Sequence, residues 1–299
     1  MVYTLWLGEG CGMAAVYRGF GQAELDREYS PSSMVADMGA ELAHATAVSG
    51  SAYRELTVRR DLPYGPEAPE RTDFFPAEGA DGPAPLHVYV HGGYWQELDK
   101  TDSAFAAPDL VRRGAAFAAV GYGLAPGWDL DAIVDQVRRA VLRLLDDAEQ
   151  LGVDPARVWL SGSSAGAHLV AMALLDPRIA GRVAGAVLLS GVYDLEPIAL
   201  SYVNGPLGLD ADGARRNSPL HLLADALPEA GLPPLVIALG EHETAEFGRQ
   251  QAEFAAAARA TGTALRELVV KGRNHFDLPL DLGRTDTELG AAVAELTGA

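Results

Sequence analysis

With 299 residues and 48% hydrophobic content, the chain is long enough for one domain with a large core. Its formal net charge of −18 argues against binding to nucleic acid or to anionic membrane surfaces. Cys11 is the single cysteine, so no internal disulfide can form, and we expect the protein in a reducing compartment, the cytoplasm.

Residues 1–50 carry a helical pattern without strands, and we expect them to form a segment that packs on the main domain near its functional site. The apolar start of the chain is short, lacks a basic region and meets Glu9 at once, so we expect no signal peptide. No apolar run reaches the roughly 20 residues that a membrane span requires. Gly8-Glu9-Gly10-Cys11-Gly12 lacks the flanking strand and helix of a phosphate-binding loop.

Strands begin after this segment. Residues 54–60 and 71–75 predict two antiparallel edge strands, joined through the turn Leu62-Pro63-Tyr64-Gly65. Strands and helices then alternate, which predicts a mostly parallel sheet flanked by helices, an α/β fold over residues 51–299. The expected strands lie at 86–90, 115–120, 158–160, 184–189, 235–239 and 265–270, and the expected helices at 133–145 and 289–296. The interval 197–233, rich in Pro, Gly and Leu, interrupts the pattern and is predicted to be a small cap or lid.

A glycine pair follows the strand at 86–90, in His91-Gly92-Gly93-Tyr94-Trp95. This run resembles the loop that binds the oxyanion in acyl-transfer enzymes. Backbone NH groups reach the charged oxygen of a tetrahedral intermediate only where no side chain blocks the approach, which accounts for Gly92 and Gly93. The NH of Ala165 would complete the oxyanion hole. A plain glycine turn is the alternative.

Gly162-Ser163-Ser164-Ala165-Gly166 fits G-x-S-x-G and connects the strand at 158–160 to an apolar helix. That context is typical of a nucleophile elbow. The sharp turn forces the serine into a strained backbone conformation that only small flanking residues tolerate. We therefore predict Ser164 as a nucleophile, and Ser163 as a neighbour whose hydroxyl the turn does not aim.

A serine hydroxyl is a weak nucleophile until a base takes its proton, so a histidine held by a carboxylate is expected later in the chain. Of seven histidines, only His242 and His275 lie in loops after late strands. His275 comes after the last strand, in a predicted loop starting at Lys271, and is the expected base. His168 is expected to pack or hydrogen-bond near the elbow, and His91 to brace its loop.

The acid is expected in Gly240-Glu241-His242-Glu243, which follows the strand at 235–239. The two glutamates compete for this role. The same stretch has side chains that can bind metals, but neighbours in sequence rarely converge on one ion and no matching histidine pair exists. We therefore expect no metal site and no cofactor.

The sequence resembles the kynurenine formamidase (arylformamidase) family of the α/β-hydrolase fold, from about Gly19 to the C-terminus. The resemblance implies that Ser164 is the nucleophile, His275 the base and Glu243 the acid. Family members usually carry aspartate in place of Glu243, and the fold accepts either acid. The motifs that carry the resemblance, in the order of the family, are Tyr29-Ser30-Pro31-Ser32, Leu62-Pro63-Tyr64-Gly65, His91-Gly92-Gly93-Tyr94-Trp95-Gln96, Val134-Asp135-Gln136-Val137, Ser164-Ala165-Gly166-Ala167-His168-Leu169, Ser190-Gly191-Val192-Tyr193-Asp194-Leu195-Glu196-Pro197 and Asn217-Ser218-Pro219.

The resemblance also implies an activity, the hydrolysis of the N-formyl amide of N-formyl-L-kynurenine to kynurenine and formate by a metal-independent serine hydrolase. Its partner is then a small aromatic substrate, with no nucleic acid and no membrane. A homodimer is the assembly considered for this chain, and its oligomeric state stays open. Candidate walls for the aromatic substrate, each of which equally fits core or loop packing, are Tyr94, Trp95, Trp128 and Tyr202.

Two other functions remain open at this stage. The same residues serve a carboxylesterase or a carbamate or aryl-amide hydrolase acting on another small substrate, because a fold does not specify a function. A substrate panel separates these enzymes. The more distant alternative is a ligand receptor built on a disabled hydrolase, which burst release from a chromogenic ester would exclude.

Overall fold

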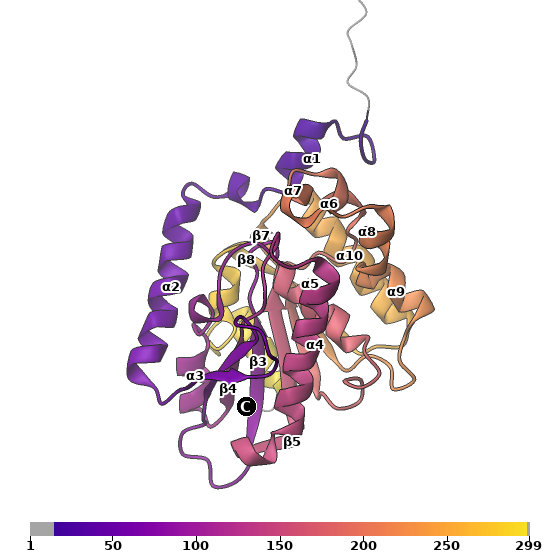
Figure 1. Cartoon of the computed structure of the whole chain (residues 1–299). Coiled ribbons are helices and arrows are strands. Elements are labelled where there is room, and N and C mark those ends of the chain that lie inside the picture. Colours follow the sequence, from indigo (N-terminus) through magenta and orange to yellow (C-terminus); the bar gives the residue numbers. More distant parts are fainter. Residues whose placement is uncertain (1–14, 298–299) are drawn as a thin grey trace, which may run out of the picture.

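A computed structural model describes residues 15–297 as an α/β structure around one eight-stranded sheet (Figure 1). The strand order is β1-β2-β4-β3-β5-β6-β7-β8. Strand β2 pairs antiparallel with both β1 and β4, and every other pairing is parallel. The predicted parallel sheet with an antiparallel edge is therefore confirmed. The expectations for the apolar start of the chain, for Gly8–Gly12 and for Cys11 lie outside the described residues.

The strands are β1 Arg59–Pro63, β2 Arg71–Phe75, β3 Ala84–Val90, β4 Ala116–Val120, β5 Val153–Ser163, β6 Gly185–Leu189, β7 Leu235–His242 and β8 Leu265–Asn274. The α-helices are α1 Gln22–Glu28, α2 Met38–Glu55, α3 Ala107–Arg112, α4 Leu130–Asp146, α5 Ala165–Leu174, α6 Glu196–Leu200, α7 Asn204–Leu207, α8 Ala211–Arg216, α9 Pro219–Asp225, α10 Ala245–Ala260 and α11 Glu288–Thr297. Short 3-10 helices lie at η1 Pro31–Met34, η2 Lys100–Asp102, η3 Glu149–Leu151 and η4 Leu278–Asp281.

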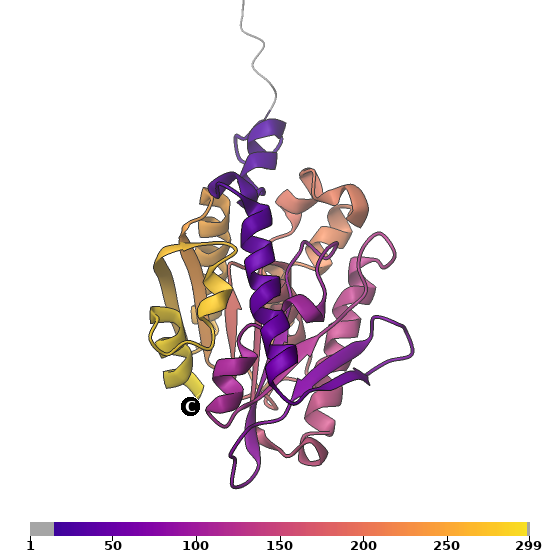
Figure 2. The ribbon, with the colours of Figure 1, turned by 90° about the vertical axis from the view of Figure 1, so that its left-hand side faces the viewer.

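Two hydrophobic cores cover the two faces of the sheet, because successive strand residues point to opposite sides. In β3, Val88 belongs to the core under α4, α5 and α10, whereas its neighbour Tyr89 belongs to the core under α2, α3 and α11. The strands are apolar on both faces, as expected for a parallel sheet covered by helices. Figure 2 shows α2 running across the front of one face.

Two expected elements differ from the structure. Residues 54 and 55 end helix α2, and the edge strand begins only at Arg59. Polar and apolar residues alternate here as in a strand, but Ser49, Ala52 and Leu56 are buried along one side of the helix and its end. Residues 271–274, expected in a loop, extend strand β8, because β7 continues through His242 and pairs with Asn274.

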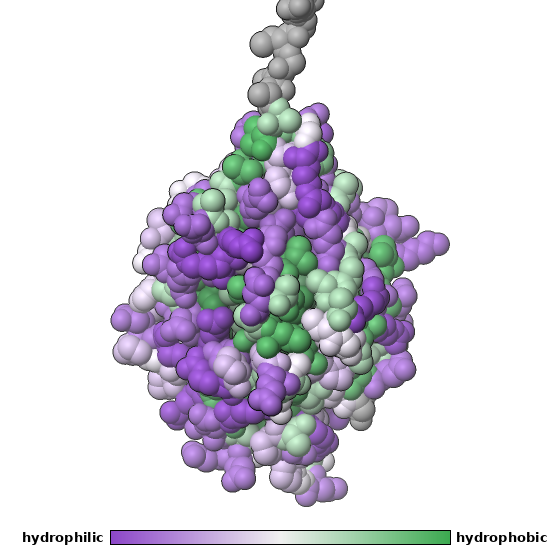
Figure 3. All heavy atoms as spheres, turned by 90° about the vertical axis from the view of Figure 1, so that its right-hand side faces the viewer, coloured by the Kyte–Doolittle hydropathy of each residue, from purple (hydrophilic) through white to green (hydrophobic). Residues whose placement is uncertain are grey.

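Helices α6 to α9 occupy the interval predicted as a cap, between β6 and β7, and α6 and α7 lie beside α1 in Figure 1. Two hydrogen bonds tie α1 to the turn after α6: the Gln22 amide donates to the Leu200 carbonyl at 2.9 Å, and the Tyr202 NH donates to Asp26 at 2.8 Å. The side of the molecule that carries α8 and α9 is mostly hydrophilic, with an apolar area near its centre (Figure 3). Within residues 15–297, no helix is long and apolar enough to cross a membrane.

Candidate active site

Five side chains of interest directly follow the carboxyl ends of five parallel strands. His91 follows β3, Ser164 follows β5, Ser190 follows β6, Glu243 follows β7 and His275 follows β8. Parallel strands present their carboxyl ends at one edge of the sheet, where open α/β sheets bind their ligands. Residues separated by up to 184 positions in the sequence are therefore gathered along one edge.

Ser164 stands on a strained turn between β5 and α5. Its φ of 55° and ψ of −121° lie outside the regions that most residues adopt, a conformation that costs on the order of 1–3 kcal/mol. Its NH donates to the Leu189 carbonyl at 2.8 Å, which fixes the turn. A Cβ atom on Gly166 would collide with the Val90 carbonyl oxygen, and one on Gly162 would lie 2.5 Å from the Gly166 carbonyl carbon. The two glycines are thus required by close backbone approach.

The NH groups predicted for the oxyanion hole have no hydrogen-bond acceptor in the described part of the chain. Among residues 15–297, no internal hydrogen bond uses the NH of Gly92, Gly93 or Ala165 as donor. The loop packs closely on the elbow, since a Cβ atom on Gly92 would lie 2.9 Å from the Ser163 carbonyl oxygen. Three donors next to Ser164 are therefore available to a ligand oxygen.

His275 and Glu243 form a buried hydrogen-bonded pair. The His275 Nδ1 lies 2.8 Å from the Glu243 Oε2, and the Glu243 side chain is 1% exposed. The other carboxylate oxygen, Oε1, accepts hydrogen bonds from the Ser190 hydroxyl at 2.5 Å and from the Gly240 NH at 2.9 Å. The rings of Phe247 and Phe276 lie edge-on to the imidazole. Because Nδ1 faces the carboxylate, Nε2 is the nitrogen left for proton transfer.

Glu241 and His242, the two other candidates from this stretch, lie at the surface. The Glu241 carboxylate accepts a hydrogen bond from the Gly272 NH at 2.8 Å on the neighbouring strand, and its side chain is exposed. His242 is also exposed. The structure therefore brings Glu243, and not Glu241, to His275.

The remaining site histidines are structural in their contacts. His91 donates from Nδ1 to the Gly92 carbonyl at 2.9 Å and stacks on Tyr122 at 4.0 Å, so it braces the loop. His168 lies between the Asn217 carbonyl, 2.7 Å from Nε2, and the Trp95 indole NH, 3.2 Å from Nδ1. Burial lowers the pKa of both histidines to about 4. Both rings are neutral at pH 7.

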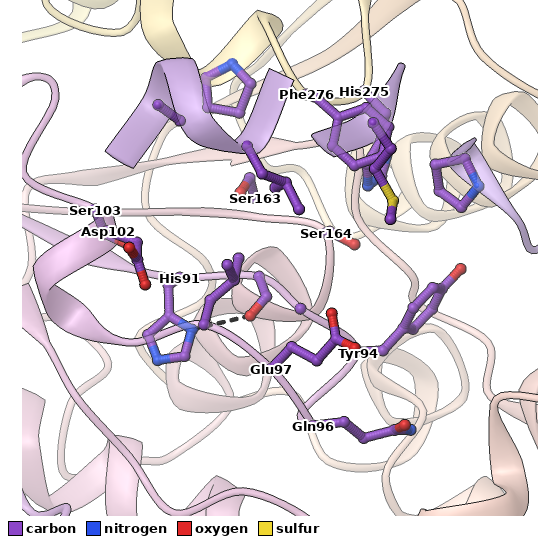
Figure 4. Close-up of a pocket in the computed structure, with 18 of the residues that line it drawn as sticks. His91, Tyr94, Gln96, Glu97, Asp102, Ser103, Ser163, Ser164, His275 and Phe276 are labelled. Carbon is purple, nitrogen blue, oxygen red and sulfur yellow. Dashed lines mark hydrogen bonds between the residues drawn. The ribbon is translucent and has the colours of Figure 1, made fainter. Parts of the chain in front are cut away.

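A cavity of about 280 Å³ opens in front of Ser164 and His275. Figure 4 shows the Ser164 hydroxyl directed into it, between His275 and Tyr94. Its far wall comes from helix α2, through Met38, Leu42, Ala45 and Thr46. The lining also contains apolar and aromatic side chains from other elements, namely Pro31, Tyr89, Tyr94, Leu98, Phe105, Tyr202, Val203, Phe276 and Pro279.

The charged residues of this cavity are all acidic. Of the residues that the structure describes, Glu97 and Asp102 line it, and no lysine or arginine does. Asp102 already accepts hydrogen bonds from the Thr46 hydroxyl at 3.0 Å and the Asp99 NH at 3.1 Å. Glu97 is exposed at the cavity, where Figure 4 shows its carboxylate near Tyr94. Within residues 15–297, no group of three or more potential ligands is arranged to hold a metal ion.

The four expected aromatic walls separate into two pairs. Tyr94 and Tyr202 line the cavity, and both hydroxyls donate to the Tyr29 carbonyl, at 2.7 Å and 3.2 Å. Trp95 and Trp128 lie outside the lining. Trp95 is fully buried against His168, and Trp128 packs over the backbone of Gly123. The expectation that these two tryptophans line the substrate cavity is corrected, because Trp95 is packed in the core and Trp128 covers the Gly123 backbone.

Comparisons with known proteins identify the family of this chain. Residues 72–181 match the BD-FAE family. A kynurenine formamidase of Danio rerio is 34% identical over 272 residues, which cover 88% of this chain and 92% of that protein. This chain belongs to the kynurenine formamidase family. A kynurenine formamidase of Drosophila melanogaster is 30% identical and covers 89% of this chain and 94% of its own.

Esterases are also among the relatives of this member of the kynurenine formamidase family. An isoprenylcysteine alpha-carbonyl methylesterase of Arabidopsis thaliana is 25% identical over 77% of this chain and 59% of that protein. A solved structure from Silicibacter sp. tm1040, described as that of a thioesterase, is 26% identical to this chain. The two superpose with a TM-score of 0.78 over 90% of this chain and 98% of that one. The protein is therefore a hydrolase with the α/β-hydrolase fold.

Ser190 is the site residue that sequence reasoning missed. It begins one of the motifs that resemble the family, yet no role follows from the motif itself. Its position directly after a parallel strand, like those of Ser164 and Glu243, was the available signal.

Proposed function

We propose that this hydrolase removes the formyl group of N-formyl-L-kynurenine or a close aryl formamide, with Ser164 as nucleophile, His275 as base and Glu243 as the acid that orients it. The observation that carries the proposal is the buried hydrogen bond between Glu243 and His275 at a cavity that Ser164 lines. An imidazole held through Nδ1 leaves Nε2 for proton transfer, as a general base requires.

The reaction runs in two acyl-transfer steps. The Ser164 Oγ attacks the formyl carbon while His275 takes its proton, and the NH groups of Gly92, Gly93 and Ala165 stabilise the charged oxygen. The carbon–nitrogen bond then breaks as His275 returns the proton to the aniline nitrogen, which leaves as the amine. Water, deprotonated by His275, attacks the formyl ester, and the proton returns to Ser164 as formate leaves.

The cavity suits an aromatic compound that carries a cationic group. Its apolar lining can hold an aryl ring, and its charged side chains are carboxylates without a lysine or arginine. The cavity therefore favours an ammonium group of a ligand over an anionic group of a ligand. N-formyl-L-kynurenine, the substrate suggested by the family, combines an aryl formamide with a zwitterionic amino-acid group, whose ammonium these carboxylates can attract.

An esterase is the second candidate, and the relationship to the plant methylesterase favours it. The same nucleophile, base and oxyanion hole cleave esters and amides alike. An anilide nitrogen is the harder leaving group, because it must receive a proton as the bond breaks. The difference between the two functions therefore lies in substrate positioning.

Turnover of N-formylkynurenine, N-acetylkynurenine and matched aryl esters tests the proposal. We expect kcat/KM to be much higher for the formyl than for the acetyl compound, because binding of the aromatic amino-acid part positions a small acyl group for attack. Equal rates on the two amides, or faster turnover of aryl esters of longer acids, would replace the formamidase with an esterase.

A further inference from the structure

Ser190 contacts Glu243, the proposed catalytic acid, on the side away from the cavity. It is the first residue after β6 and is 1% exposed, so its hydroxyl reaches no solvent and no substrate. The hydroxyl donates to the Glu243 Oε1 at 2.5 Å, and the Ser190 NH donates to the Ala238 carbonyl at 2.8 Å. Ser190 is therefore attached to strand β7 on one side and to the carboxylate that follows this strand on the other.

The two oxygens of Glu243 have separate partners. Oε2 faces the His275 Nδ1 at 2.8 Å, while Oε1 accepts from both the Ser190 hydroxyl and the Gly240 NH. A glutamate side chain has three rotatable bonds, one more than aspartate, and its terminal torsion is broad. Hydrogen bonds to an ionised acceptor are about twice as strong as neutral ones. Two donors on Oε1 therefore hold Oε2 in the direction of His275.

The backbone at Ser190 is unfavourable for any residue other than glycine. Its φ is 48°, in the left-handed region, where glycine would avoid the conformational cost. A glycine would also lack the hydroxyl that binds Glu243. The strained serine thus resembles Ser164, whose side chain is likewise presented by a residue with positive φ directly after a strand.

We propose that Ser190 is a positioning residue that fixes the Glu243 carboxylate in the orientation needed to align His275. This inference rests on the proposed roles of Glu243 and His275. Without the hydroxyl, Oε1 keeps only the Gly240 NH as donor, and the carboxylate can rotate away from the imidazole. Loss of one hydrogen bond to a charged group corresponds to a roughly 10- to 100-fold loss. We expect this loss in kcat, with KM within about twofold, because Ser190 does not touch the substrate.

The test is a double-mutant cycle with Ser190→Ala, Glu243→Gln and the combined variant, assayed on N-formylkynurenine and on a chromogenic aryl ester. Ser190→Ala is expected to lower kcat on both substrates. In the Glu243→Gln background, the same substitution should cost less than about threefold, since the carboxylate that it orients is gone. Ser190→Gly relieves the backbone strain and should lose as much activity as Ser190→Ala, which separates the hydroxyl from any effect of the backbone.

Ser161→Ala is the matched control. This serine is also fully buried in the adjacent strand β5, where its hydroxyl lies 2.7 Å from the His87 Nε2, away from Glu243. The control should lower the melting temperature without lowering kcat. The inference is overturned if Ser190→Ala and Ser190→Gly retain kcat within twofold, or if the losses from Ser190→Ala and Glu243→Gln multiply. A wild-type enzyme that cleaves the ester but not the formamide overturns the proposed substrate and leaves the test of Ser190 intact.

Discussion

The cavity has two halves that are built differently. On the sheet side, the candidate catalytic groups follow strand ends and are buried, with Ser164 6% exposed and each Glu243 oxygen hydrogen-bonded. On the opposite side, helix α2 and the turn between α6 and α7 contribute Met38 and Tyr202, which are 42% and 52% exposed. The candidate catalytic groups thus lie in the buried half, whereas the opposite, open half has few constraints from packing.

This contrast has a physical cause. The position of these strand ends is determined by ladder hydrogen bonds, on both sides for β3, β5, β6 and β7 and on one side for the edge strand β8, and by two cores. A displaced catalytic group would therefore disturb the sheet around it. A surface helix that packs by one stripe tolerates substitutions on its exposed residues. We expect variants of the sheet side to change kcat strongly, and variants of the α2 side to change substrate preference.

The largest effect is expected for Ser164→Ala. Removal of a nucleophile costs on the order of 10⁴-fold or more in turnover. Labelling by a fluorophosphonate probe should disappear with it. Ser163→Ala should cost far less, because its hydroxyl accepts from the Tyr89 hydroxyl at 2.8 Å and does not stand on the strained turn. A labelled Ser164→Ala protein would contradict the assignment.

Glu243→Gln should follow, with a loss of about 10²- to 10⁴-fold in kcat, because an amide cannot stabilise the charged imidazole and its NH₂ group can face His275. Glu241→Gln is the matched variant and should be nearly neutral, since its carboxylate binds the Gly272 NH at the surface. Glu243→Asp should fall between them, because a shorter side chain cannot reach both His275 and Ser190. Steady-state kinetics on all three variants measure this order, and the reverse ranking of the Gln variants would give the role to Glu241.

The buried histidine His168 predicts that the free energy of unfolding decreases at acidic pH. The pKa of His168 is lowered from 6.5 to about 4 by burial, so between these values the unfolded chain binds a proton that the folded protein does not. The free energy of unfolding should therefore fall as the pH drops from 6.5 toward 4, by roughly 3 kcal/mol for one such histidine. Denaturant unfolding of His168→Gln should show a smaller dependence on pH than wild type. An identical dependence would mean that His168 is protonated in the folded state.

The smallest effect is expected on the open half of the cavity. Glu97→Gln should raise KM for N-formylkynurenine about threefold with little change in kcat, because an exposed ion pair contributes modestly. The analogue that lacks the amino group serves as the control, and its KM should not respond to the substitution. A loss that is equal on both compounds would indicate that Glu97 shapes the loop and does not bind an ammonium group.

Local patterns in the sequence were enough for much of the fold and part of the site. The alternation of strands and helices predicted the parallel sheet, and the glycines around Ser164 predicted a turn whose reason proved to be close backbone approach. These features depend on residues adjacent in the chain. The edge strand was misplaced at residue 54 because the pattern of Leu56 and Val58 fits a strand locally, while packing of Ala52 and Leu56 on the core continues the helix.

The sequence alone predicts an α/β sheet with a serine on a strained strand-to-helix turn, a glycine loop beside it and a late histidine. Which side chains meet depends on the tertiary structure. The continuation of β7 and β8 beyond their apolar runs directs Glu243 toward His275 and Glu241 to the surface. The burial of Trp95 and the contact of Ser190 with Glu243 likewise depend on partners more than 50 residues away in the chain. Such contacts are set by the register of strands and the packing of helices, which no local pattern specifies.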